Sequence, residues 1–141
     1  MARIDSDESY VIELCDVVVG STGHRQHRFE WLRGSVSPTT GRSVALPVDA
    51  FWPDRGLVVE FRESQHFEAT PFFDKPDRAT VSGVHRGEQR RLYDELRDRL
   101  IPANGLRLLV IRTEDFSTRG KRIRRGAEDL ETVRRLLSSD S

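Results

Sequence analysis

The chain has 141 residues, of which 36% are hydrophobic and 33% are charged, and its 23 basic side chains balance its 23 acidic ones. This length supports one domain with a hydrophobic core, and a formal net charge of zero gives no global attraction to nucleic acid. A single cysteine, Cys15, excludes an intrachain disulfide and a cysteine-based zinc cluster. We expect a cytoplasmic protein, because the N-terminal residues lack the apolar core of a signal peptide and no apolar stretch reaches membrane-spanning length.

Two helices are predicted in the first quarter of the chain. Residues 5–20 carry apolar side chains at helical spacing, a serine or aspartate near the start can cap them, and Gly20 is a suitable end. Residues 24–33 are predicted to form the second helix, because a glycine follows them directly. Residues 35–43 are rich in Ser, Pro, Thr and Gly, which predicts a loop.

A β-hairpin is predicted over residues 46–61, LPVDAFWPDRGLVVEF. Pro53 favours the start of a turn, and Gly56 tolerates the positive φ that closes a bulged hairpin. With residues 53–56 as the loop, Trp52 lies opposite Leu57. One face of the hairpin is then wholly apolar and is expected to pack inward; it comprises Val48, Ala50, Trp52, Leu57, Val59 and Phe61.

The second half of the chain contains fewer strand signals. In chain order we expect a segment without clear periodicity at residues 63–83, a helix at 84–100 and a short buried strand at 106–111. A basic segment at 117–126 and an amphipathic helix at 127–137 follow. This order predicts an α/β or α+β domain with a small mixed sheet flanked by helices. We expect residues 1–116 to form a single domain, and residues 117–141 to add a basic linker and a C-terminal amphipathic helix on or near it.

The predicted hairpin carries an acid on each limb. Its register places Asp49 opposite Glu60 on one face, where two like charges cost up to about 1 kcal/mol. A divalent cation, Mg²⁺ or Mn²⁺, is the usual reason for two convergent carboxylates; the alternative is two exposed acids that each meet an arginine. Arg62 points to the same face and His66 follows four residues later. Together these side chains could bind a metal, stabilise a phosphate and handle a proton, which suits metal-assisted phosphodiester hydrolysis.

The hairpin resembles the PD-(D/E)XK nuclease superfamily, which places an acid on one limb and Glu-x-Lys on the next. Asp49 and Glu60-Phe61-Arg62 carry this resemblance, and the run from Val58-Val59-Glu60 to Gln65-His66 is most similar to the branch of very-short-patch mismatch-repair endonucleases. The resemblance covers about residues 24–116. It implies a restriction-endonuclease-like core and a Mg²⁺-dependent DNA endonuclease or nickase. It also implies a further acid from the helix before the hairpin, for which Glu30 is the candidate.

Arg62 stands where the superfamily usually has lysine. Arginine can stabilise developing negative charge but stays protonated, so it cannot act as a base. His66 is the natural replacement, because the unperturbed pKa of histidine lies near neutrality. The substitution leaves open a catalytically inactive nuclease-fold module that binds nucleic acid, and a third possibility is a structural partner of a larger system.

Several further side chains are candidates for DNA contact. His24 and His27 have the spacing of metal ligands, but the interleaved Arg25 and Arg28 are more typical of a basic helix face that contacts phosphate or is simply solvated. On the predicted helix 84–100, the candidates are Arg86, Gln89 and Arg90. Gln89 and Tyr93 resemble the Gln-x-x-x-Tyr pair of the exonuclease branch, with a polar helix residue and a packing tyrosine as the alternative. A homodimer is possible, because a domain this small often needs one to cut both strands.

Overall fold

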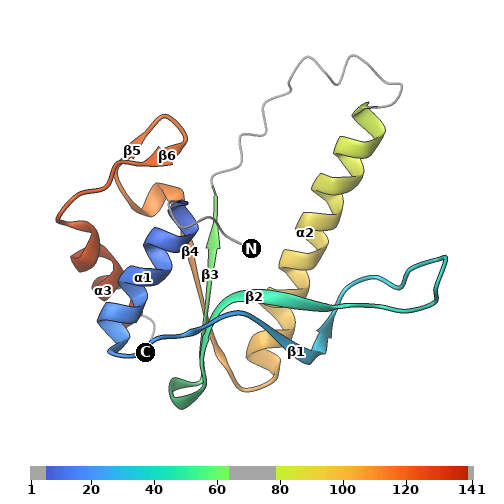
Figure 1. Ribbon diagram of the computed structural model, residues 1–141, viewed down its shortest axis with the longest axis horizontal. Helices are drawn as coiled ribbons and strands as arrows, with labels where there is room; N and C mark the ends of the chain where they lie inside the picture. The colour runs from blue at the N-terminus through green and yellow to red at the C-terminus, as the bar shows by residue number, and fades with distance from the viewer. Residues whose placement is uncertain (1–5, 64–78, 140–141) are drawn as a thin grey trace.

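The computed structural model describes residues 6–63 and 79–139 and has a mixed α+β architecture (Figure 1). The elements, in order, are α1 (Asp7–Val19), β1 (His24–Arg33), β2 (Ala45–Trp52), the 3₁₀ turn η1 (Pro53–Arg55), β3 (Leu57–Arg62), α2 (Ala79–Ala103), β4 (Arg107–Arg112), the 3₁₀ turn η3 (Thr113–Asp115), β5 (Thr118–Arg119), β6 (Arg122–Ile123) and α3 (Asp129–Ser138). The main sheet has the order β1-β2-β3-β4, and β5 pairs with β6 in a separate two-stranded sheet. The predicted mixed sheet with flanking helices is confirmed.

Helices cover both faces of the main sheet. Strands β1, β2 and β3 are antiparallel, whereas β4 runs parallel to β3 after the crossover through α2. Helices α1 and α3 lie on one side of the sheet and α2 lies on the other (Figure 1). The first five residues of β3 are buried for this reason, since neither of their faces meets water.

The hairpin has the predicted turn and register. Trp52 pairs with Leu57, and the pairs continue to Ala50 with Val59. Gly56 adopts φ 57°, a left-handed conformation that favours glycine, and closes the turn. Most of the predicted apolar face packs against α1, as a cluster that includes Ala50, Trp52, Leu57, Val59 and Phe61.

Val48 departs from this predicted face. It lies beyond the last pair between β2 and β3 and packs in a second cluster, beneath α2. That cluster also contains Val58 and Ile101. The two clusters therefore form cores on opposite faces of one sheet.

The helix predicted at residues 24–33 is wrong, because these residues form strand β1. They pair with β2, from His24 opposite Phe51 to Arg33 opposite Ala45. Trp31 and Phe29 alternate with exposed charged residues, which is the period of a strand rather than of a helix. Arg25, Arg28 and Glu30 consequently do not lie on a helix face.

The other predicted elements differ in their bounds. Helix α2 begins at Ala79, five residues before the predicted start, and β4 and α3 lie close to their expected positions. The predicted linker contains β5 and β6, and the C-terminal part packs on α1 through Phe116, Ile123 and Val133. None of the described helices combines the length and the hydropathy that crossing a lipid bilayer requires.

Polar contacts also join the two ends of the described chain. The Tyr10 hydroxyl donates to Asp129 Oδ2 at 2.5 Å. The backbone N–H of Ile123 donates to Asp7 Oδ2 at 3.0 Å, and Asp7 is buried. Helix α1 is thus held by residues more than a hundred positions later in the chain.

We predict that Gly23→Ala destabilises the fold. A Cβ at Gly23 would lie 2.6 Å from Cε2 of Trp52, whose ring is buried and whose indole N–H donates to Ser21 O at 2.9 Å. Neither the ring nor the backbone can move away freely, so the free energy of unfolding should fall by about 1–3 kcal/mol in urea titrations. Gly87→Ala is the matched control, because a Cβ there meets nothing within 4 Å. It should leave stability unchanged or raise it by up to about 1 kcal/mol; equal losses would contradict the prediction.

Candidate active site

The acids of the hairpin exchange hydrogen bonds across the two strands. The backbone N–H of Asp49 donates to Glu60 Oε2 at 2.8 Å, and the N–H of Phe61 donates to Asp49 Oδ2 at 2.7 Å. These bonds begin directly after the last backbone pair, Ala50 with Val59, so the carboxylates continue the strand pairing. The predicted opposition of Asp49 and Glu60 is confirmed. Neither acid is the solvated side chain of the alternative, since Glu60 is 5% exposed and Asp49 is half-buried.

A third carboxylate reaches this pair from helix α1. Glu8, in the first turn of the helix, is hydrogen bonded to Asp49 and accepts from Gln26 Nε2 at 3.1 Å. Gln26 also forms a hydrogen bond to Asp49. Its backbone has φ 51°, a left-handed conformation that is rare for a residue other than glycine. An unusual backbone at the centre of a polar cluster is typical of functional sites.

The acid that the sequence suggested for this position, Glu30, does not join the cluster. Glu30 lies on strand β1, its side chain is 94% exposed, and its partner is Arg33 at 3.5 Å. The helix before the hairpin is α1, and its first turn brings Glu8 to Asp49. The acidic start of the first predicted helix was a usable signal. It could not separate Glu8 from Asp7, which instead binds the backbone of Ile123.

Burial and mutual repulsion make the three acids hard to ionise. Burial, followed by the charge of Asp49, raises the pKa of Glu60 to about 8. Burial, again followed by the charge of Asp49, raises the pKa of Glu8 to about 7. The pKa of Asp49 is also raised by burial, against the opposing effects of the Phe61 N–H and of Arg97. In the absence of a cation, the cluster therefore favours protonated carboxyl groups.

Two arginines border the acids, and helix α2 fixes both. Arg62, on β3, forms ion pairs with Asp98 at 2.8 Å and Asp94 at 3.7 Å and is 11% exposed in its side chain. Its guanidinium is thus neutralised by α2. Arg97, which was not a predicted site residue, lies 3.6 Å from Glu60 Oε1 and donates twice to the carbonyl oxygen of Pro47.

The remaining predicted site residues lie apart from the acids or outside the described chain. His66 lies outside the described residues. Arg25 forms an ion pair with Asp16 at 2.6 Å, and Arg28 donates to the carbonyl oxygen of Ala45. The three candidates on α2 are exposed: Arg86, Gln89 and Arg90.

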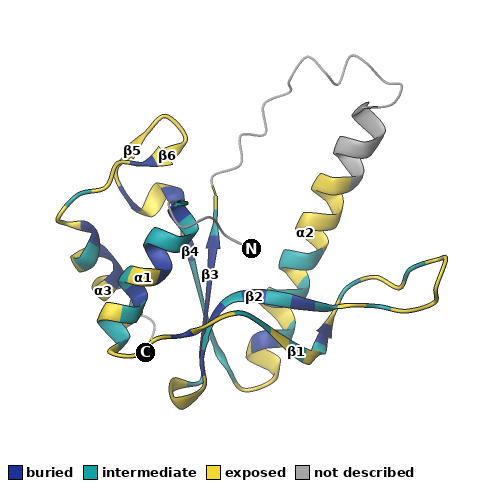
Figure 2. Cartoon of the chain, viewed as in Figure 1, coloured by how far each residue is buried: buried dark blue, intermediate teal, exposed yellow. Residues whose placement is uncertain are grey.

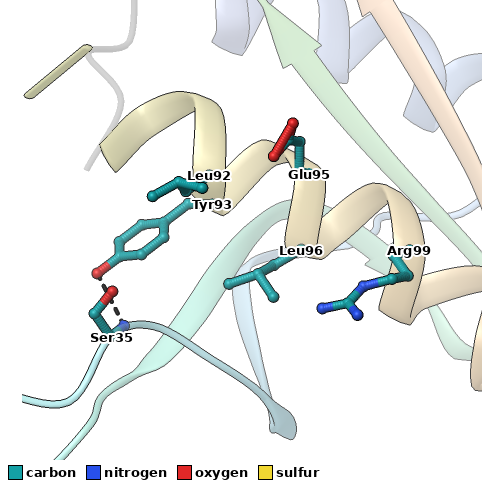
Figure 3. A pocket seen from close by; sticks show the side chains of 6 residues that line it. All are labelled: Ser35, Leu92, Tyr93, Glu95, Leu96 and Arg99. Carbon is teal, nitrogen blue, oxygen red and sulfur yellow. Dashed lines mark hydrogen bonds between the residues drawn. The ribbon is translucent and has the colours of Figure 1, made fainter. Parts of the chain in front are cut away.

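Tyr93 packs against the loop that follows β1. Its hydroxyl accepts a hydrogen bond from the N–H of Ser35 at 3.2 Å, beside a cavity of about 470 Å³ that Leu96 also lines (Figure 3). None of the three clustered acids lines this cavity. The structure therefore gives Tyr93 the packing role that was the alternative for the Gln89–Tyr93 pair.

The acids fit a hydrated Mg²⁺ better than a fully protein-coordinated metal. Within residues 6–63 and 79–139, no three His, Cys, Asp or Glu side chains are grouped so as to hold a metal ion. Asp49 and Glu60 each use one oxygen for a backbone amide, and each has a second oxygen. Mg²⁺ typically binds one or two carboxylates and keeps several waters, so these oxygens suit it.

Comparison of the chain with family models, with curated proteins and with solved structures finds no match. The likeness of the hairpin to the PD-(D/E)XK superfamily stays a resemblance. The case for a function therefore depends on the geometry and electrostatics of the acids.

We predict that stability falls as pH rises, in the absence of divalent cations. Folded Glu60 keeps its proton up to about pH 8, whereas the unfolded carboxyl loses it near 4.5. Folding takes up a proton between these values, so the free energy of unfolding decreases by up to roughly 1.4 kcal/mol per pH unit for one such group. Urea titrations in EDTA between about pH 5 and 8 measure this slope.

Glu60→Gln should flatten the slope and stabilise the protein most at the upper end of this range. The amide oxygen can still accept from Asp49 N–H. Glu13→Gln removes an exposed carboxylate of α1 and should leave the slope as in the wild type. Equal slopes in the wild type and Glu60→Gln would show that the Glu60 pKa is not raised.

Proposed function

We propose that this protein is a metal-dependent DNA nuclease that hydrolyses phosphodiester bonds at the acids of the hairpin. One observation carries the proposal: carboxylates from α1, β2 and β3 meet where the β2–β3 pairing ends, and burial raises the pKa of all three. Buried like charges are costly unless something offsets them. A bound divalent cation offsets them, and acid clusters with perturbed pKa values are typical of active sites.

Asp49 and Glu60 would hold Mg²⁺ or Mn²⁺, with Glu8 beside them. The cation would polarise a phosphoryl oxygen and lower the pKa of a bound water. Around it, the side chains of this protein have distinct tasks. Gln26 orients Glu8 and Asp49, and Arg97 holds Glu60 while it ties β2 to α2. His66 is the proposed base, as the sequence suggests.

The architecture supports the resemblance that the hairpin residues carry. The mixed sheet has helices on both faces, an acid on each limb of the central hairpin, and a further acid from the preceding helix. The resemblance implies each of these features, with Glu8 in place of Glu30.

The second candidate is an inactive nuclease-fold module that binds nucleic acid. Arg62 favours it, because Asp94 and Asp98 neutralise the side chain that stands in the position of the catalytic lysine. The backbone bonds of Asp49 and Glu60 also favour it, since they give both acids a structural role that needs no metal. Catalysis and binding are separated by the two experiments below.

We predict that supercoiled plasmid is cut in Mg²⁺ or Mn²⁺, and that Asp49→Asn and Glu60→Gln lose at least about a hundredfold in rate. The estimate follows from removal of a ligand to a catalytic cation, where even changes around the ligands cost about 10–100-fold. Glu8→Gln should be impaired more than Glu30→Gln, because Glu8 contacts Asp49. Gel assays of nicked and linear product give the rates.

Glu13→Gln is the control for loss of negative charge and should cut at the wild-type rate. Wild-type protein that cuts neither plasmid nor mismatched or single-stranded substrates with either metal would refute the nuclease. The inactive module that binds nucleic acid would then be the remaining candidate function.

DNA contact is expected on the half of α2 that extends beyond the sheet. Residues 86–92 are all exposed, so this part of the helix has water on every side (Figure 2). It carries Arg86, Arg90 and Arg91, of which Arg91 is paired with Glu88 at 2.5 Å. A helix that is exposed all round is suited to meet a partner, and these charges suit phosphate.

We predict that Arg86→Ala and Arg90→Ala each weaken duplex binding and lower the slope of log K against log salt by about 1. Fluorescence anisotropy across a salt series in EDTA measures both quantities without cleavage. Arg134→Ala, on α3, is the control and should keep the wild-type slope. If both α2 variants also keep it, the phosphate contacts lie elsewhere.

A further inference from the structure

A continuous row of aromatic rings follows strand β1 and includes one ring of β2. The ring centroids of His24 and His27 lie 5.9 Å apart, and those of His27 and Phe51 lie 4.9 Å apart. Phe29 lies 4.8 Å from Phe51 and 4.6 Å from His27. Trp31 stacks on Phe29 at 4.5 Å with an interplanar angle of 16°. The row therefore runs from His24 to Trp31 without a break.

A residue with left-handed backbone, Gln26, lies between the two histidines of the row. In a regular strand, side chains two residues apart share a face, so His24 and His27 would point to opposite faces. Gln26, with φ 51°, lies between them, and the rings of His27, Phe29 and Trp31 follow it in mutual contact. The same residue that donates to Glu8 thus lies within the row.

The rings are open to solvent, in contrast to the core beside them. His24 is exposed, and the other four are half-buried. Phe29, Trp31 and Phe51 pack with one side on the apolar cluster beneath α2. Core packing accounts for that side of three rings, and it does not account for the two imidazoles at the open end.

The row begins next to the candidate active site. Gln26, between the two histidines, donates to Glu8. Phe51 is two residues beyond Asp49 on β2, and it pairs with His24 of β1. A ligand that contacts the rings at His24 and Phe51 is therefore two residues away, along each strand, from Gln26 and Asp49.

We propose that this row is a stacking platform for the unpaired bases of a single-stranded or locally opened nucleic acid. Arg25 is paired with Asp16, whereas Arg28 donates to the neutral Ala45 carbonyl and keeps its positive charge beside the rings. Flat rings with polar imidazole edges suit nucleobases, whose faces stack on aromatic side chains whatever the sequence. This inference rests on the proposed function for its substrate class, and it makes unpaired DNA the preferred substrate.

Binding without metal tests the platform separately from catalysis. In EDTA, the full-length protein should bind labelled oligothymidylate of about 20 nucleotides more tightly than a duplex of equal length. His24→Ala/His27→Ala should weaken the single-strand complex about tenfold or more, as expected for lost stacking, with an unchanged salt slope. Duplex affinity should change little. His24→Phe/His27→Phe keeps the rings and should restore single-strand binding; thermal unfolding of each variant verifies folding.

Tryptophan fluorescence supplies a second readout. Trp31 belongs to the row, whereas Trp52 is 2% exposed and bonded to Ser21. Oligothymidylate should quench the emission of the wild type, and Trp31→Phe should abolish that quenching.

Three results would overturn the platform: equal affinity for single strand and duplex, full affinity in the double alanine variant, or no binding of either DNA. The nuclease can fail independently. Ring-dependent binding without any cleavage would support the stacking platform and refute the nuclease. Plasmid cleavage without ring-dependent binding would support the nuclease and refute the platform.

Discussion

The exchange of backbone amides between Asp49 and Glu60 is the interaction on which the centre of this structure depends. It continues the β2–β3 pairing beyond Ala50 and Val59 with side chains in place of carbonyls. Helix α2 is joined to it through Arg97, and α1 and β1 are joined to it through Glu8 and Gln26. Elements from both faces of the sheet therefore meet at two carboxylates, and a change in their charge acts on all of them.

The hairpin could be predicted because its determinants are local. Pro53 and Gly56 set the turn, and alternation sets the register on either side. Strand β1 could not be predicted in the same way. Residues 24–33 have a composition that a helix also accepts, and their strand state depends on pairing with β2, up to 27 positions later. The left-handed conformation of Gln26 has no signal in the sequence.

In the candidate site, too, the residues with local determinants could be predicted, and those that depend on long-range packing could not. Asp49 and Glu60 followed from the register of the hairpin, whereas Glu8 approaches them through the packing of α1, which is a long-range contact. The choice of Glu30 followed directly from the wrong helix. Arg62 was placed on the correct face, but its neutralisation by Asp94 and Asp98 depends on how α2 crosses the sheet. Local patterns thus identified the acids and missed the groups that control their charge.

The packing of α1 against the C-terminal part has a consequence for synthesis on the ribosome. Helix α1 leaves the exit tunnel before its partners Phe116, Ile123 and Val133, which emerge only after strands β1 to β4. Until then its apolar face, with Val11, Ile12 and Cys15, lacks part of its cover. Glu8 belongs to this helix, so the packing around the acid cluster is completed only after residues up to Val133 have emerged. Nascent chains in which residues up to Val133 have not all left the exit tunnel would accordingly lack part of the packing that holds Glu8 in place.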